Sequence, residues 1–250
     1  MSDDIEISAT IVTYNEDIET LKKTVNCFLN TPLSKKLYVV DNSPTDALKN
    51  HLKQPEITYF FAGKNLGFGK AHNLVISELT SEFHLILNPD VTFNSQVLPN
   101  LIQELRKQET VAMISPKIVY PDGSMQFYCR KYPSFSELIY RRLGLFKRKT
   151  QASEYRNLDL SKSFFPESMH GCFMLFKTQD FIKINGFDER YFLYMEDIDI
   201  CKKIDIINKK KMYFPNETIK HLHQRGSAKK INLLFQHLLS ARKYFKKWQN

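Results

Sequence analysis

Length, composition and charge bound the kind of protein that this chain can form. Its 250 residues are 42% hydrophobic and 13% aromatic, enough to bury one substantial core with room for a small appended lobe. No apolar run approaches the ~20 residues that span a bilayer, and the acidic start SDDIE is unlike a secretory signal peptide. Four scattered cysteines without a metal-binding spacing predict reduced thiols, so we expect a cytoplasmic protein.

Strand and helix signals alternate through the first half of the chain. Apolar runs predict strands over 5–13, 36–40, 57–61, 83–87 and 111–115, and amphipathic spacing predicts helices over 17–30, 68–79 and 95–107. Such alternation favours an α/β fold with a mostly parallel central sheet and helices on both faces.

Polar side chains stand at the end of each of the first four predicted strands or shortly after it. They are Thr13, Tyr14 and Asn15, then Asp41 and Asn42, then Lys64 and Asn65, and finally Asn88 and Asp90. In open α/β sheets the carboxyl ends of strands bind ligands, so this edge is typical of a nucleotide-binding rim. Neither G-x-G-x-x-G nor G-x-x-x-x-G-K-[ST] occurs, which argues against a nicotinamide enzyme and a P-loop ATPase.

Two acidic elements indicate chemistry. Asp90 follows a buried strand and suits a hard divalent ion that also contacts phosphate oxygens, although an Asx-Pro turn with a solvated carboxylate is the alternative. The segment GFDERYFLYMEDIDIC (186–201) brings Asp188, Glu196, Asp197 and Asp199 to the start of a predicted helix. Helix capping would explain these carboxylates, and so would a general base walled in by aromatic rings.

Seven segments occur in the order found in one enzyme family. They are IVTYN (11–15), VVDNSP (39–44), KNLGFGKAHN (64–73), LNPDV (87–91), HGCFMLFK (170–177), GFDERYFLYMEDIDIC (186–201) and HLHQRGS (221–227). On these motifs the chain resembles family-2 inverting glycosyltransferases of the GT-A fold, most closely the rhamnosyltransferase-like branch that builds bacterial surface polysaccharides. The resemblance implies a GT-A domain over 1–227 with a Rossmann-like nucleotide-sugar-binding half (1–115) and an acceptor-binding, catalytic half (116–227), then a basic helix over 228–250.

The resemblance also implies the residues that hold the nucleotide-sugar donor. They are Thr13, Tyr14, Asp41, Asn65, Lys70, Asn73, Asp90 and Arg225. A carboxylate at Asp41 can accept hydrogen bonds from a pyrimidine imide or a ribose hydroxyl, and an Asx turn is the alternative role. Lys70 and Arg225 are equally consistent with solvated cations.

A divalent cation, Mg²⁺ or Mn²⁺, is implied as well. Asp90 matches the last aspartate of the family's D-x-D motif, whose first position is Asn88 here. A histidine in HLHQRGS matches a further ligand: His223 fits the family spacing best, and His221 lies two residues away on the same face of a strand. An imidazole ligand would favour Mn²⁺.

Catalysis, by the same resemblance, is a single in-line displacement with inversion at the anomeric carbon. Asp197 matches the catalytic base of the family's E-D pair, Glu196 orients the acceptor or the base, and Asp199 is a helix cap or a structural carboxylate. Gly171 and Cys172 match a tight turn beneath the acceptor site.

The net charge of +9 is concentrated toward the C-terminus. Leu234, Leu238, Ala241, Phe245 and Trp248 form an apolar stripe, flanked by Arg242, Lys243, Lys246 and Lys247, and residues 141–149 add a second basic cluster. This pattern is typical of a helix on an anionic membrane surface, and packing against the catalytic domain is the alternative.

The expected partners are therefore a nucleoside-diphosphate sugar, with dTDP-rhamnose favoured over a UDP-hexose, and a glycan or lipid-linked glycan acceptor. Two other classes stay open. A basic chain rich in aromatics could bind nucleic acid, although no nucleic-acid-binding signature occurs. A catalytically inactive carbohydrate-binding relative is the other possibility, and the complete E-D pair argues against it.

Overall fold

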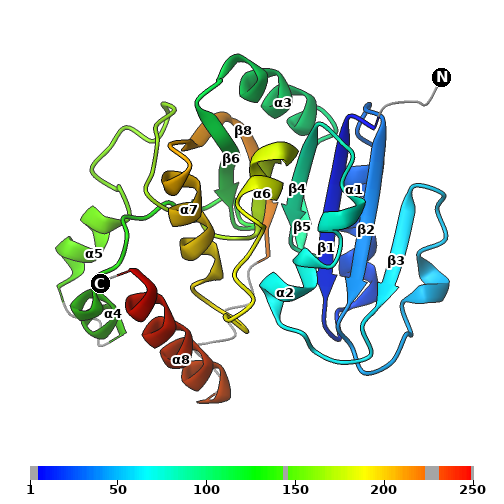
Figure 1. The fold of residues 1–250 in the computed structure, drawn as a ribbon. Coiled ribbons are helices and arrows are strands. Elements are labelled where there is room, and N and C mark those ends of the chain that lie inside the picture. The colour runs from blue at the N-terminus through cyan, green and yellow to red at the C-terminus, as the bar shows by residue number, and fades with distance from the viewer. Residues whose placement is uncertain (1–4, 143–145, 223–230, 249–250) are drawn as a thin grey trace.

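A computed structural model describes residues 5–142, 146–222 and 231–248, and these residues form one mixed sheet with helices on both faces (Figure 1). The strands are β1 (Ile7–Thr13), β2 (Lys35–Asp41), β3 (Ile57–Phe61), β4 (Phe83–Leu87), β5 (Val91–Thr92), β6 (Val111–Val119), β7 (Phe173–Lys177) and β8 (Lys210–His221). Their order in the sheet is β3-β2-β1-β4-β7-β6-β8-β5.

The helices of the first half confirm most of the predicted boundaries. They are α1 (Ile18–Leu29), α2 (Phe68–Asn73) and α3 (Val97–Lys107), and the second half adds α4 (Phe135–Arg142), α5 (Lys147–Ser153), α6 (Thr178–Lys183), α7 (Glu196–Ile206) and α8 (Ile231–Trp248). Asp17 caps α1 by accepting from the Thr20 amide at 2.8 Å. The helix predicted over 68–79 is shorter, because α2 ends at Asn73 and only a 3₁₀ turn, Ile76–Glu78, follows.

The sheet combines the predicted parallel strands with antiparallel pairs in its second half. Strands β3, β2, β1 and β4 are parallel, but β7 enters between β4 and β6 and is antiparallel to both. Strand β8 is parallel to β6 and antiparallel to β5. The apolar sequence of β7 does not indicate whether the strand runs parallel or antiparallel, because its pairing with strands distant in the chain decides this.

The handedness of the crossovers places the site. The chain moves from β1 to β2 in one direction along the sheet and from β3 to β4 in the other. Since both crossovers join parallel strands and such crossovers are right-handed, α1 and α2 lie on opposite faces. The strand order therefore reverses between β1 and β4, and a ligand crevice is expected outside the carboxyl ends of these two strands.

The hydrophobic core lies on both sides of this sheet, with Ile7, Ala9 and Ile11 of β1 fully buried. A second, smaller cluster joins Tyr191 and Met195 to Tyr244 and Phe245 of α8. The C-terminal helix is thus packed against the segment that precedes α7. No helix in the described part of the chain is long and apolar enough to cross a membrane.

Candidate functional site

The ends of β1 and β2 are joined by a buried carboxylate. Asp41 is fully buried; its Oδ1 accepts from the Thr13 hydroxyl at 3.2 Å and from the Ser43 amide at 2.9 Å, and its Oδ2 accepts from the Tyr59 hydroxyl at 2.6 Å. The bond to Ser43 is the Asx turn that the sequence left open. Burial and this carboxylate raise the pKa of Tyr59, so the phenol stays a donor. Tyr14, beside this pair, is exposed at the rim.

The predicted donor loop is held by backbone contacts that require glycine. The Gly67 amide donates to Asn65 Oδ1 at 2.9 Å, and the Gly67 carbonyl accepts from Asn42 Nδ2 at 3.1 Å. Gly67 has a φ of +83°, and a Cβ there would lie 2.2 Å from the Phe192 carbonyl oxygen. The next amide, of Phe68, donates to that same oxygen at 3.1 Å. The donor loop therefore rests directly on the segment before α7.

Lys70 and Asn73 also contact that segment. Lys70 forms an ion pair with Glu189 at 3.2 Å. The Asn73 side-chain amide exchanges two hydrogen bonds with the Phe187 backbone, at 2.8 and 2.9 Å. In the structure both residues join α2 to the segment before α7, and their predicted role in donor binding stays a prediction.

Asp90 and His221 lie together at the opposite side of the rim. Strand β5 pairs with the end of β8 so that Val91 faces His221, and the Leu222 amide donates to the Asp90 carbonyl at 3.1 Å. The side chains meet with His221 Nε2 at 3.3 Å from Asp90 Oδ1. Burial opposes the charged ring, but Cys172 and Asp90 beside it raise the pKa of His221 to about 10. His223 and Arg225 lie outside the described residues.

Two residues near Asp90 were missed in the sequence. Gln126 contacts both the ring and the carbonyl of His221, at 3.0 and 2.7 Å. Glu16, half-buried, has a raised pKa because of its burial and because of the charge on Asp90. Its position directly after Thr13-Tyr14-Asn15 was the available signal.

The donor atoms fit a divalent cation. In the part of the chain that the structure describes, no three His, Cys, Asp or Glu side chains group closely enough to hold a metal by themselves. A carboxylate oxygen and an imidazole nitrogen, 3.3 Å apart, offer an incomplete set that diphosphate oxygens can complete.

The E-D pair begins α7 after two left-handed residues, Tyr194 (φ 67°) and Met195 (φ 71°). Glu196 is buried, and its Oε2 has no hydrogen-bond partner among the residues that the structure describes. Burial, then the neighbouring Asp197, raises the pKa of Glu196, so this side chain tends to stay protonated. Asp197 is only partly buried, and its Oδ1 accepts from the Ile198 amide at 2.9 Å.

The turn before β7 connects the E-D pair with Asp90. A Cβ on Gly171 would lie 3.5 Å from the Cβ of Asp197, so the turn packs against this carboxylate. Burial by itself would raise the pKa of the Cys172 thiol, but the adjacent His221 and His170 lower it to about 7. The Cys172 carbonyl accepts from the Asn88 amide at 2.9 Å. The structure thus brings the predicted base, the acceptor turn and the predicted metal ligands into one continuous cluster.

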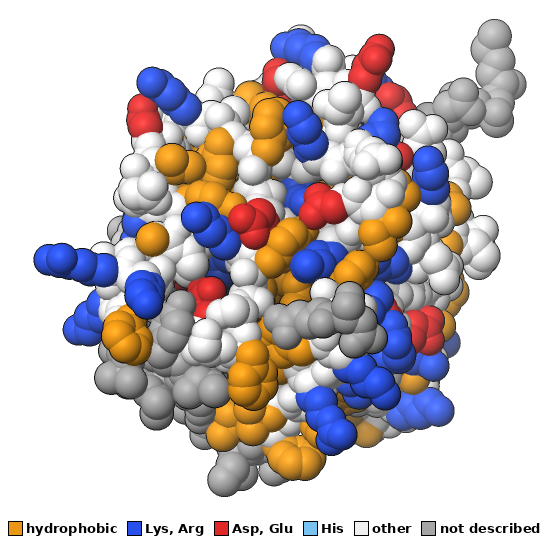
Figure 2. Space-filling view, turned by 60° about the vertical axis from the view of Figure 1, so that its left-hand side comes forward, with side chains coloured by type: hydrophobic (Ala, Val, Ile, Leu, Met, Phe, Trp, Pro, Cys, Tyr) orange, Lys and Arg blue, Asp and Glu red, His pale blue; other side chains and the backbone are white. Residues whose placement is uncertain are grey.

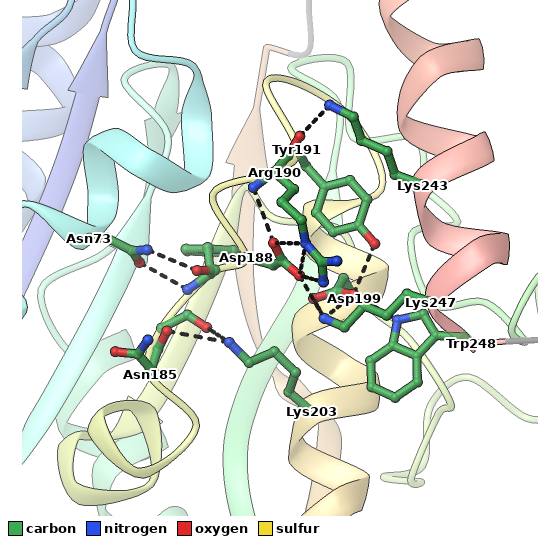
Figure 3. A network of polar contacts seen from close by, with 12 residues as sticks. Asn73, Asn185, Asp188, Arg190, Tyr191, Asp199, Lys203, Lys243, Lys247 and Trp248 are labelled. Carbon is green, nitrogen blue, oxygen red and sulfur yellow. Dashed lines mark hydrogen bonds and ion pairs between the residues drawn. The ribbon is translucent and has the colours of Figure 1, made fainter. Parts of the chain in front are cut away.

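Of the two roles predicted for Asp199, helix cap and structural carboxylate, its contacts match the second. It is fully buried and accepts from the Tyr191 hydroxyl at 3.1 Å, from Trp248 Nε1 at 2.7 Å and from Lys247 Nζ at 2.8 Å (Figure 3). Lys247 also reaches Asp188 Oδ2 at 2.8 Å. Through Lys247 and Trp248, the end of α8 therefore binds both α7 and the segment that precedes it.

This arrangement corrects one detail of the predicted basic helix. Lys247 and Trp248 face the catalytic domain, and Lys243 donates to the Arg190 carbonyl at 2.5 Å. The outward face of α8 instead carries Phe235, Leu238, Arg242 and Lys246.

Two family models match the chain, and one of them covers more than half of it. The family model described as "Glycosyl transferase family 2" matches residues 8–175, and the model "N-terminal domain of galactosyltransferase" matches residues 158–225. The N-acetylglucosaminyl-diphospho-decaprenol L-rhamnosyltransferase of Mycobacterium tuberculosis is 26% identical, over 95% of this chain and 82% of that protein. Rhamnosyltransferase WbbL of Escherichia coli is 26% identical over 72% of this chain and 70% of its own length.

Solved structures share the fold. Mannosyltransferase PcManGT of Pyrobaculum calidifontis, in complex with GDP-Man and Mn²⁺, has a TM-score of 0.68 at 18% identity, over 98% of this chain and 65% of that one. GalNAc-T7 with UDP, GalNAc and Mn²⁺ has a TM-score of 0.69 at 17% identity. That match covers 88% of this chain and 44% of the GalNAc-T7 chain. The predicted GT-A fold is confirmed.

Proposed function

The chain belongs to glycosyl transferase family 2, and on that premise we propose that it moves a rhamnosyl residue from dTDP-rhamnose to a lipid-linked glycan in surface polysaccharide synthesis. The two rhamnosyltransferases among its relatives support the sugar, and the diphospho-decaprenol in one of their names supports a lipid-linked acceptor. A UDP-hexose is the second donor to test. The observation that carries the proposal is the cluster that joins Asp197, through the turn at Gly171, to Asp90 and His221.

The proposed mechanism assigns one proton transfer to the chain. Asp197 takes the proton of an acceptor hydroxyl as that oxygen attacks the anomeric carbon and the nucleoside diphosphate leaves from the opposite side. Glu196, whose pKa is raised by burial and by Asp197, can in its protonated form donate a hydrogen bond to the acceptor. Asp90 and His221 would hold a divalent cation, Mn²⁺ or Mg²⁺, which when bound neutralises charge on the diphosphate.

An Asp197→Asn variant tests the reaction. Because the amide keeps the shape but takes up no proton, we expect turnover at saturating donor to fall about 10²–10⁴-fold while donor binding persists. Asp159→Asn, which changes an exposed loop carboxylate, is the matched control and should retain activity. Near-normal turnover in Asp197→Asn would remove it as the base. A thermal-shift panel of dTDP-, UDP- and GDP-sugars with each cation would identify the donor, and stabilisation by a UDP-hexose alone would exclude dTDP-rhamnose.

We also propose that the enzyme docks on the anionic cytoplasmic face of the membrane. Large apolar side chains are exposed on α4, directly before α5 and on α8, among them Phe135, Phe146, Phe235 and Leu238. Helices α5 and α8 also expose basic side chains, those of Lys147, Arg148, Lys149, Arg242 and Lys246. The one described acidic residue of α4, α5 and α8 is Glu137, and it is buried. Figure 2 shows apolar and basic side chains gathered on the lower part of this face. Exposed aromatic and cationic side chains without acidic neighbours complement anionic lipid headgroups.

Vesicle co-sedimentation tests this surface. Phe235→Ser with Leu238→Ser should reduce binding to phosphatidylcholine vesicles that contain phosphatidylglycerol, and leave turnover of a water-soluble acceptor analogue unchanged. Ile206→Ser, which alters an exposed apolar residue of α7, should change neither. If the wild-type protein ignores anionic vesicles, the docking surface is wrong, while the glycosyl transfer reaction is unaffected.

A further inference from the structure

Gln126 holds His221 through both of its side-chain polar atoms. This glutamine is buried, and its backbone amide donates to the Ile118 carbonyl at 2.9 Å. Its Nε2 donates to the His221 carbonyl at 2.7 Å and to the Val119 carbonyl at 3.5 Å. Its Oε1 lies 3.0 Å from His221 Nδ1. Ring and backbone of the same histidine are thus fixed by one side chain.

The two carbonyls decide the direction of these hydrogen bonds. A backbone carbonyl can only accept, so the Gln126 amide nitrogen must face the carbonyls and its oxygen must face the ring. The oxygen in turn can only accept, so Nδ1 of His221 carries a proton. The other ring nitrogen, Nε2, then points to Asp90, 3.3 Å away.

We propose that Gln126 is the positioning residue of the metal centre: it keeps a proton on Nδ1 of His221, so that Nε2 is the nitrogen that releases its proton and binds a divalent cation together with Asp90. The inference rests on the proposed metal-dependent transfer and deepens it by selecting His221 as the protein's nitrogen ligand. Ligating histidines depend on such partners, because the partner fixes both the tautomer and the orientation of the ring.

Backbone hydrogen bonds place Asp90 and His221 side by side, which makes the role of Gln126 specific. Strand pairing of β5 with β8 sets the Cα position of His221, and the bond from the Leu222 amide to the Asp90 carbonyl fixes Asp90 beside it. What the strands leave undecided is the rotation of the imidazole and the nitrogen that bears the proton. The Gln126 oxygen decides both.

Binding of Mn²⁺ in the presence of dTDP or UDP, followed by electron paramagnetic resonance, tests the proposal without catalysis. Gln126→Met keeps the side-chain volume and removes all three contacts, so Mn²⁺ binding should weaken about 10–100-fold. Gln108→Met replaces a glutamine remote from Asp90 and should bind Mn²⁺ as the wild type does. Unchanged Mn²⁺ affinity in a folded Gln126→Met variant would overturn the proposal.

Two further measurements separate the possible failures. If His221→Ala leaves Mn²⁺ binding intact, His221 is no ligand and the proposed metal centre itself is wrong. If His221→Ala weakens binding and Gln126→Met does not, only the role of Gln126 fails. Imidazole ¹⁵N spectra of the wild type with Mg²⁺ and dTDP read the tautomer directly, so they remain decisive even if Gln126→Met does not fold. A proton on Nε2 in that state would contradict the proposal.

Discussion

Replacing Lys247 with methionine should destabilise the protein far more than an ordinary change near a chain end. Lys247 Nζ contacts three carboxylate oxygens, one of Asp188 at 2.8 Å and two of Asp199 at 2.8 and 2.9 Å (Figure 3). Asp188 keeps its ion pair with Arg190 in the variant, whereas Asp199 retains only the neutral donors Tyr191 and Trp248.

The expected size follows from burial. Breaking a buried ion pair by removing one partner costs about 3–5 kcal/mol, because the remaining charge is left without compensation. Asp199 is fully buried, but one fifth of the Lys247 side chain is exposed, so water can approach and the low end, about 3 kcal/mol, is expected. For a chain of this size that loss corresponds to a Tm lower by roughly 6–12 °C.

Urea unfolding of Lys247→Met against Lys246→Met measures the difference. Lys246 is the adjacent residue of α8 and is exposed, so its replacement should change the free energy of unfolding by less than about 0.5 kcal/mol. The double variant Lys247→Met, Asp199→Asn should recover part of the loss, because it removes both charges. Equal stabilities of the two single variants would refute the reasoning.

Three further predictions concern the site. Burial raises the pKa of Glu196, so folding favours its protonated form. The contribution of this group to the free energy of unfolding is therefore fully present below the usual carboxyl pKa and is lost as pH rises through the raised pKa. Glu196→Gln should therefore be more stable than the wild type at pH 8 and equal to it at about pH 4 in urea unfolding. Gly67→Ala should cost more stability than Gly123→Ala, because both glycines have positive φ but only Gly67 faces a carbonyl oxygen, at 2.2 Å from the added Cβ. Equal losses by thermal unfolding would exclude that clash. Asp90→Ala should abolish cation-dependent binding of nucleoside diphosphate in calorimetry with an unchanged circular dichroism spectrum, and retained binding would remove Asp90 from the centre.

The elements of the first half could be predicted because their signals are local. An apolar run predicts β3 at its observed residues, and amphipathic spacing predicts α1 to within a residue at each end. The polar residues that follow the strands could be predicted as one rim, since the carboxyl ends of parallel strands meet at one edge. The order of the motifs pointed to the family that the comparisons then showed.

Tertiary structure decided the rest, because it depends on pairs of residues that lie far apart in the chain. The antiparallel direction of β7 comes from its partners β4 and β6. Lys247 looks like a solvated lysine in the sequence, yet it lies 48 residues beyond Asp199 and balances that buried charge.

The proposed metal ligands show the same division. The sequence by itself predicted that Asp90 follows the strand now seen as β4, because strand ends are read along the chain, and motif resemblance pointed to a histidine at 221 or 223. Only the pairing of β5 with β8 set His221 beside Asp90, and only the return of the chain after β6 put Gln126 against the ring. Neither contact has a local signal, since burial of a polar side chain becomes favourable only once its distant partner is in place.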